Sequence, residues 1–236
     1  MVMRATFQKR EQLTETISTF WFKPERPLRY TAGQFTELTL KHAHPDDRGI
    51  KRWFTLSSSP TDDLVSITTK FAGDTSSSFK KTLFNLQPGT EVQLAEAMGD
   101  FVLPKLTQTP LIFVAGGIGL TPFHSMFEWL AATGETRDIR FLYAVNSEDD
   151  IIFQDTFDKV GIHATIIVSN PSEAWGGLRG RLDAQTILGL EKPTEDTLVF
   201  LSGPEPMIEA LQADLQEQGV AKRQLVGDFF PGYTQL

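Results

Sequence analysis

The rhythm of the sequence changes near residue 104, and this change constrains the fold more than any other feature. Before it, short segments rich in β-branched and aromatic residues alternate with Gly- and Pro-containing turns. These segments cover residues 16–22, 35–40 and 64–69. One helix is expected over about residues 77–86. Closely spaced strands of this kind predict a small antiparallel β-barrel.

After residue 110, apolar strand-like runs alternate with segments that have helical spacing. The expected strands cover residues 111–115, 139–145, 164–168 and 197–201. The expected helices begin at Thr121 and lie near residues 153–160, 184–188 and 204–218. This alternation predicts a parallel sheet with helices on both faces. We therefore expect two domains, residues 1–104 and 110–236, with the linker between them.

Composition excludes several functional classes. The chain has 236 residues and a formal net charge of −8, which argues against a nucleic-acid partner or a binder of anionic membranes. It contains no cysteine, which excludes a disulfide or a cysteine-ligated iron–sulfur cluster in this sequence. No apolar run approaches the roughly 20 residues of a membrane span. Since no secretory signal is evident at the start, we expect a cytoplasmic protein.

Charge is distributed unevenly along the chain. Residues 1–106 carry 14 basic and 12 acidic side chains, whereas residues 107–236 carry 8 and 18. Solvated surfaces explain such an imbalance most simply. A more specific interpretation is that basic residues of the first half meet an acidic partner protein. The residues concerned are Arg48, Lys51, Lys80 and Lys81.

A glycine-rich turn follows the first strand of the second half. Its residues include Gly116, Gly117 and Gly119, and it is closed by Thr121 and Pro122. Glycines remove the β-carbons that would block a pyrophosphate, and the following helix presents backbone N–H groups to it. The register differs from the usual G-x-G-x-x-G pattern. The alternative is a tight strand-to-helix turn that needs glycine for its geometry alone.

A second turn follows the strand that ends at residue 201. Its residues Ser202, Gly203, Pro204 and Met207 are expected near the glycine-rich turn, because parallel strands end at the same edge of a sheet. A nicotinamide could lie there against small side chains. Plain helix initiation is the alternative, since proline suits the first turn of a helix.

The first half carries an arginine–aromatic–hydroxyl pattern at Arg52, Trp53, Phe54 and Thr55. A guanidinium can bind a phosphate through a bidentate pair of hydrogen bonds. An aromatic ring can cover a flat cofactor, and a hydroxyl can hydrogen-bond the edge of that cofactor. Residues 73–78 open the expected helix with hydroxyls and backbone N–H groups that suit a second phosphate contact. Helix capping by serine or threonine is the alternative there. Together with the glycine-rich turn, the pattern suggests electron transfer between a nicotinamide and a flavin.

The histidines do not predict a metal site. His42 and His44 lie in a loop with Asp46 and Asp47, where a solvated loop is favoured over a surface metal site because the ligand spacing is irregular. His124, on the first turn after the glycine-rich loop, is expected to face solvent. No Ser–His–Asp signature for hydrolysis is present.

In these features the chain resembles the ferredoxin–NADP reductase superfamily over nearly its whole length. That family joins a flavin-binding barrel to a pyridine-nucleotide domain, which implies flavin binding by residues 1–104 and NAD(P) binding by residues 110–236. The ordered set of motifs, rather than any one of them, makes the resemblance specific. The motifs are Ala32-Gly33-Gln34-Phe35, Arg52-Trp53-Phe54-Thr55, Pro88-Gly89, Gly116 to Pro122, Trp175-Gly176 with Gly180-Arg181, Ser202-Gly203-Pro204 with Met207, and Asp228 to Tyr233.

The resemblance implies a role for individual residues. Arg52 would bind a flavin phosphate, Phe54 would lie against the flavin and Thr55 would meet its N5 atom. Ser77 and nearby amides would hold the pyrophosphate, and Thr121 would lie between flavin and nicotinamide. The implied catalytic residues are Thr55, Ser202 and Asp228. The further implied cofactor contacts are Trp53, Thr69, Lys70, Ser78, Gly116, Gly117, Gly119, Pro122, Gly203, Pro204, Met207, Phe229, Phe230 and Tyr233.

Three positions depart from the family pattern. The family often has tyrosine where Phe54 stands, so one hydroxyl contact to the flavin is missing. It often has cysteine where Ser202 stands, so a thiol near the nicotinamide is replaced by a hydroxyl. Asp228 is interpreted as the replacement for an acidic residue that relays protons in some relatives. The aromatic residues of the tail, Phe229, Phe230 or Tyr233, would cover the flavin or its adenine; the alternative is that they are simply buried in the core.

The expected function is that of a flavin-dependent NAD(P)H oxidoreductase, with FAD expected over FMN and NADH or NADPH as co-substrate. Hydride would pass from the nicotinamide to flavin N5, and electrons onward to a small molecule or to an acidic acceptor protein such as a ferredoxin, flavodoxin or cytochrome. The acidic segment 146–150 favours NADH, since it is similar to that of NADH-using cytochrome b5 reductases and would repel the 2′-phosphate of NADPH. Arg179 or Arg181 could compensate for that repulsion. The alternatives are a reductase subunit of a larger complex and a regulatory nucleotide-binding module without turnover.

Overall fold

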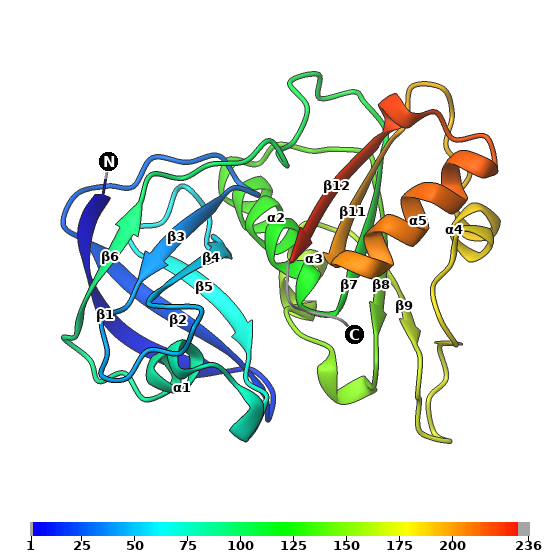
Figure 1. Ribbon diagram of the computed structural model, residues 1–236. Coiled ribbons are helices and arrows are strands. Elements are labelled where there is room, and N and C mark those ends of the chain that lie inside the picture. The colour runs from blue at the N-terminus through cyan, green and yellow to red at the C-terminus, as the bar shows by residue number, and fades with distance from the viewer. Residues whose placement is uncertain (1, 231–236) are drawn as a thin grey trace. The chain divides into compact units, whose positions relative to one another are not determined.

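The computed structural model describes residues 2–230, without the side chains of residues 229 and 230. The chain divides into two compact units, residues 1–102 and 103–236. Each unit has its own sheet, drawn in blue to cyan for the first and in green to red for the second (Figure 1).

The first unit is an antiparallel sheet with the strand order β4-β3-β6-β1-β2-β5. Its strands are β1 (Val2–Gln12), β2 (Ile17–Pro24), β3 (Phe35–Thr39), β4 (Lys51–Thr55), β5 (Val65–Lys70) and β6 (Glu91–Ala95). A short 3-10 turn, η1 (Gly73–Thr75), and the helix α1 (Ser78–Phe84) connect β5 to β6. The edge strands approach each other just beyond β4, where Leu56 bridges Ile67 and the Ser57 amide donates to the Ser66 carbonyl at 2.8 Å. The sheet therefore closes into a barrel.

Alternate residues of these strands fill the barrel, as period-2 side-chain direction requires. Phe7 packs against Phe20 and Phe22, with ring centroids 6.1 and 5.6 Å apart, and all three are buried. Where the barrel closes, buried hydroxyls satisfy one another: Thr68 Oγ1 lies 2.8 Å from Thr19 Oγ1 and 2.9 Å from Ser57 Oγ. Paired hydroxyls can be buried at little cost, so the seam is held by polar as well as apolar contacts.

The second unit is a parallel sheet with the strand order β10-β9-β8-β7-β11-β12. Its strands are β7 (Leu111–Gly116), β8 (Ile139–Val145), β9 (Ala164–Val168), β10 (Leu178–Arg179), β11 (Leu198–Pro204) and β12 (Leu225–Phe230). Its helices are α2 (Thr121–Thr133), α3 (Gln154–Lys159), α4 (Ala184–Leu190) and α5 (Glu205–Glu217). The 3-10 turns are η2 (Gly117–Leu120), η3 (Glu148–Asp150) and η4 (Lys222–Gln224).

The two faces of the parallel sheet are chemically different. One is covered by α2 and α3, the other by α4 and α5 (Figure 1). On the first face, Phe113 and Phe141 pack against Phe127 of α2 and Phe157 of α3. The second face is aliphatic, and its members include Ile112, Val114, Leu201, Ile208 and Leu211. Burial on both faces makes the sheet a rigid platform for the turns at its ends.

The predicted fold class is confirmed in both halves, including helices on both faces of the parallel sheet. The strand β1 was missed, although Met3, Ala5 and Phe7 alternate as buried residues along it. The prediction for His124 was wrong. This side chain is 8% exposed, and its ring packs against Phe153 with centroids 3.6 Å apart, because α2 turns it toward the start of α3.

Candidate functional site

The carboxyl edge of the parallel sheet brings together three residues that are distant in sequence. In the register of the strands, Ser202 of β11 pairs with Ala115 of β7 on one side and with Asp228 of β12 on the other. Gly203 and Pro204 pair with Phe229 and Phe230 of β12 in the same way. The side chains of Phe229 and Phe230, and the whole of Tyr233, lie outside the described residues.

The two predicted turns of this edge touch each other. A β-carbon on Gly119 would overlap the Ser202 carbonyl and lie 2.6 Å from the Gly203 Cα. A β-carbon on Gly203 would lie 3.3 Å from the Gly116 Cα. Gly117 has a φ of 52°, in the left-handed region that favours glycine. The glycines therefore let η2 lie directly against the end of β11.

The Ser202 hydroxyl is the unusual group at this edge. Its side chain is fully buried, and within residues 2–230 its Oγ atom has no hydrogen-bond partner. A buried hydroxyl without a partner is unfavourable by about 1–3 kcal/mol, so native proteins seldom keep one without a reason. The nearby Thr121 hydroxyl differs, because it donates to the Ile118 carbonyl at 3.1 Å. Ser202 thus offers an unused hydrogen-bonding group where the two turns meet.

Other predicted residues of these turns have structural roles as well. Pro122 lies in the first turn of α2, where its missing N–H costs nothing, and Pro204 caps α5 with a φ of −56°. Met207 packs against the aliphatic core of the sheet. Helix initiation, the alternative interpretation of the second turn, therefore holds for Pro204 and Met207 whether or not they also bind a ligand.

In the barrel, β4 presents Arg52 and Phe54 on one face. The Arg52 Cζ atom lies 5.2 Å from the centre of the Phe79 ring, and the Phe54 ring lies 5.9 Å from it. Thr55 is buried. Trp53 points to the opposite face, where it is 53% exposed and meets Phe35 edge-on at 5.5 Å. The structure therefore places Trp53 apart from Arg52 and Phe54.

Arg52 is engaged by the loop that precedes β4. Its Nη1 atom donates to the carbonyls of Arg48 and Lys51, both at 2.6 Å, and its Nη2 atom lies 3.4 Å from Asp46 Oδ1. Burial lowers the pKa of Arg52 somewhat, although a guanidinium stays charged at any physiological pH. Asp46 is a site residue that the sequence analysis missed as such.

The start of α1 is satisfied by side chains of the protein itself. The Ser77 hydroxyl accepts from the Lys80 amide at 3.2 Å, as a helix cap does. The Ser78 amide donates to Asp46 Oδ2 at 2.9 Å. Thr69 is buried in β5, and the Lys70 carbonyl accepts from Lys80 Nζ at 2.8 Å. The predicted phosphate contacts Arg52 and Ser78 therefore both meet one carboxylate.

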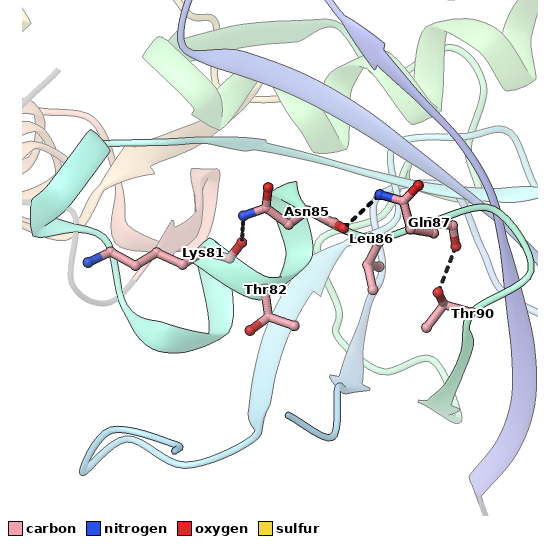
Figure 2. A pocket seen from close by; sticks show the side chains of 6 residues that line it. All are labelled: Lys81, Thr82, Asn85, Leu86, Gln87 and Thr90. Atoms are coloured by element: carbon pink, nitrogen blue, oxygen red, sulfur yellow. Dashed lines mark hydrogen bonds between the residues drawn. The ribbon is translucent and has the colours of Figure 1, made fainter. Parts of the chain in front are cut away.

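A hollow of about 390 Å³ lies elsewhere in the barrel unit, at the end of α1 and in the turn toward β6 (Figure 2). Its polar side chains close short loops on the backbone: Asn85 Nδ2 donates to the Lys81 carbonyl at 2.8 Å, and Thr90 Oγ1 donates to the Gln87 carbonyl at 2.6 Å. It contains none of the predicted site residues. The lining residues are Lys81, Thr82, Asn85, Leu86, Gln87 and Thr90.

Residues 2–230 contain no group of three or more His, Cys, Asp or Glu side chains arranged to hold a metal ion. The helices of residues 2–230 include none with the length and hydropathy of a membrane span. His42 is half-buried, and its Nε2 atom lies 3.0 Å from the Ser78 hydroxyl oxygen.

Comparison with known proteins identifies the class to which this geometry belongs. Residues 113–213, which include the glycine-rich turn and Ser202, match the family described as the oxidoreductase NAD-binding domain. This part of the second unit is therefore similar to an oxidoreductase NAD-binding domain. The whole chain has the two-domain fold of solved cytochrome b5 reductase and ferredoxin–NADP reductase structures, so the resemblance seen in the sequence is confirmed at the level of the fold.

Particular relatives are similar over most of the chain. A glycine betaine monooxygenase reductase subunit of Chromohalobacter salexigens is 31% identical over 88% of this chain, and a flavohemoprotein of Oceanobacillus iheyensis is 25% identical over 94%. The chain spans 58% and 57% of their lengths. The solved FAD/NAD-binding domain of a nitric oxide dioxygenase from Vibrio cholerae superposes with a TM-score of 0.82 at 20% identity, with 97% of this chain and 98% of that one covered.

Replacement of Gly119 by alanine tests the contact between the two turns. The added methyl group overlaps the backbone of Ser202, so we expect Gly119→Ala to lower the free energy of unfolding by about 1–3 kcal/mol or more. Gly189→Ala is the control, because Gly189 lies in α4 with open space around it. Its replacement should stabilise the helix by about 0.5–1 kcal/mol. Denaturant unfolding of both variants measures the difference; equal stabilities would contradict the close approach.

Proposed function

We propose that this chain is an FAD-dependent NAD(P)H oxidoreductase that takes hydride from a nicotinamide onto flavin N5 and passes electrons to an acceptor. The observation that carries the proposal is the buried Ser202 hydroxyl, without a partner in residues 2–230, at the carboxyl edge of an oxidoreductase NAD-binding domain. Open parallel sheets bind nucleotides at this edge. The names of the relatives, which include an FAD/NAD-binding domain and a reductase subunit, support the same reaction class.

The barrel residues fit the flavin half of the proposal. Arg52 and the Ser78 amide are donors for phosphate oxygens, with Ser77 beside them, and both donors already hold a carboxylate of the protein, so their chemistry suits an anion. Phe54 lies on the same face of β4 and would cover the flavin ring. Thr55 would contribute its hydroxyl at the end of that strand.

The turns of the second unit fit the nicotinamide half. Glycines at 116, 117 and 119 would let the dinucleotide approach the backbone, and Ser202, whose hydroxyl has no partner in residues 2–230, would hydrogen-bond the nicotinamide end. Thr121 would limit the space above the nicotinamide ring. Asp228 lies on β12, which is separated from β7 by β11, and would hold or transfer a proton. When bound, the flavin supplies the redox chemistry, and the protein supplies position and exclusion of water.

We further propose a preference for NADH. The segment after β8 forms η3 with three carboxylates, and Glu148 holds the amide and hydroxyl of Ser172 at 2.9 and 2.6 Å. Hydrogen bonds from Ser172 lower the pKa of Glu148, so this group is an anion at neutral pH. The guanidinium of Arg179 donates to backbone carbonyls, and its Nη2 atom lies 2.6 Å from the Trp175 carbonyl oxygen. An acidic segment suits a ribose hydroxyl and repels a 2′-phosphate.

We propose the chemical class of the electron acceptor from the charge of the first unit. The basic residues of the first unit, among them Arg48 and Lys51, suit an acidic acceptor protein, and a cytoplasmic location is part of the proposal. The relatives are longer than this chain, one of them a reductase subunit by name, so a component of a larger electron-transfer complex is the second candidate. A regulatory nucleotide-binding module is the third candidate.

Anaerobic reduction distinguishes the enzyme from the regulatory module. We expect the purified chain, supplied with FAD, to be yellow and to lose its visible absorbance when NADH is added, and to do so faster with NADH than with NADPH. Stopped-flow absorbance measures both rates, and chromatography of the released flavin distinguishes FAD from FMN. A colourless protein that binds a nicotinamide without reducing FAD would support the regulatory module. Co-purification with a second electron carrier would support the complex.

Arg52→Ala tests the flavin half. Loss of a charge-assisted contact to phosphate should weaken FAD binding about 10- to 100-fold, measured by quenching of flavin fluorescence. Lys51→Ala is the control, because it removes one positive charge from the neighbouring position, where Lys51 pairs with Glu37 at 2.8 Å. Its FAD affinity should stay within about twofold of the wild type. Unchanged affinity in Arg52→Ala would remove the assignment of Arg52.

Ser202→Ala separates a ligand role from a structural one. Because the hydroxyl has no partner in the described residues, its removal should leave the free energy of unfolding equal or up to about 1 kcal/mol higher. Reduction by NADH should become up to about tenfold slower. Thr121→Val, which breaks a bond to the Ile118 carbonyl, should instead lower stability. A destabilised Ser202→Ala protein with normal reduction would show that the hydroxyl is structural.

A further inference from the structure

The loop between β3 and β4 is fastened to the first residue of α1 by a reciprocal pair of hydrogen bonds. The Ser78 amide donates to Asp46 Oδ2 and the Asp46 amide donates to the Ser78 hydroxyl, both at 2.9 Å. His42 joins them: its Nδ1 lies 2.9 Å from the Leu40 carbonyl and its Nε2 lies 3.0 Å from Ser78 Oγ. Since a carbonyl only accepts, Nδ1 is the donor to the Leu40 carbonyl.

The same carboxylate reaches the arginine of β4. Asp46 Oδ1 lies 3.4 Å from Arg52 Nη2 and accepts from the Arg48 amide at 3.1 Å. The hydrogen bond from the Ser78 amide, with smaller contributions from the two arginines, lowers the pKa of Asp46. One anionic side chain thus holds the Ser78 amide and the Arg52 guanidinium together.

These are donors that the proposed function assigns to the phosphates of the flavin, and this inference rests on that function. A carboxylate and a phosphate both accept from amide and guanidinium groups, and one donor cannot serve both fully. We propose that Asp46 is an internal substitute for the cofactor's phosphate. It occupies the phosphate contacts in the unloaded protein and must be displaced when FAD binds, so loading competes with an autoinhibitory contact.

The contact has two opposite consequences. In the flavin-free protein it stabilises the barrel unit, because Arg52 and the start of α1 keep an anionic partner. In the presence of FAD it lowers the apparent affinity, because a ligand that binds only the open arrangement is weakened by the fraction of closed molecules. A variant without the carboxylate should therefore be less stable when empty and should bind FAD more tightly.

The test compares Asp46→Ala and Asp46→Asn with Asp47→Ala in the full-length chain, stripped of flavin and titrated with FAD. Asp47 is exposed on the same loop, so its removal reports the effect of net charge alone. We expect FAD to bind about five- to tenfold more tightly to both Asp46 variants than to Asp47→Ala. Riboflavin, which has no phosphate, should bind all of them equally. The flavin-free Asp46→Ala protein should also have a lower Tm than the wild type.

Each outcome decides the matter. FAD affinity in the Asp46 variants that equals or falls below that of Asp47→Ala overturns the inference, and a fall would make Asp46 a positioning residue for Arg52. Equal tightening in Asp47→Ala would assign the effect to charge and also overturn it. If the wild type and every variant fail to bind FAD, the proposed function fails and the inference with it. Asp46→Asn keeps the shape of the side chain, so it provides the answer if Asp46→Ala does not fold.

Discussion

The site at the parallel sheet depends on the absence of one β-carbon. At Gly119 the backbone of η2 approaches the Ser202 carbonyl and the Gly203 Cα so closely that no other residue fits without movement. This contact sets the separation of the two turns, and the side chain of Ser202 is buried beside it. The glycine is therefore required by packing, because the backbone of Ser202 and Gly203 occupies the position that a β-carbon would take. The two interpretations of the glycine-rich turn are compatible.

The turns can be held so accurately because the sheet beneath them is buried on both faces. Rings from α2 and α3 fill one face, and aliphatic side chains from α4 and α5 fill the other. Dense packing of this kind resists deformation, so the ends of β7, β11 and β12 are fixed relative to one another. In the barrel the corresponding constraint is polar: Asp46 ties the loop before β4 to α1.

The sequence predicted most of the architecture but only part of the site. Strand rhythm and turn residues are local signals, so both sheets and the glycine-rich turn were foreseen. The long strand β1 escaped because arginine, lysine and glutamine along it mask the alternation of Met3, Ala5 and Phe7. Asp46 and Ser78 are 32 residues apart in the sequence, and the residues of the loop contain no pattern that predicts their contact. That the Ser202 hydroxyl has no hydrogen-bond partner within residues 2–230 is a property of three-dimensional packing, which composition and spacing do not encode.

The order of the strands has a consequence for how the molecule folds. β7, β8 and β9 are neighbours in both sequence and space, so they can pair early through short connections. β11 joins the opposite side of β7 from much further along the chain, and this slower, non-local pairing brings Ser202 to η2. A partly folded sheet without β11 thus has the glycine-rich turn but lacks Ser202 and Gly203, against which that turn packs. The close contact between η2 and Ser202 can therefore form only after β11 has paired with β7, so the two turns take their final geometry late in folding.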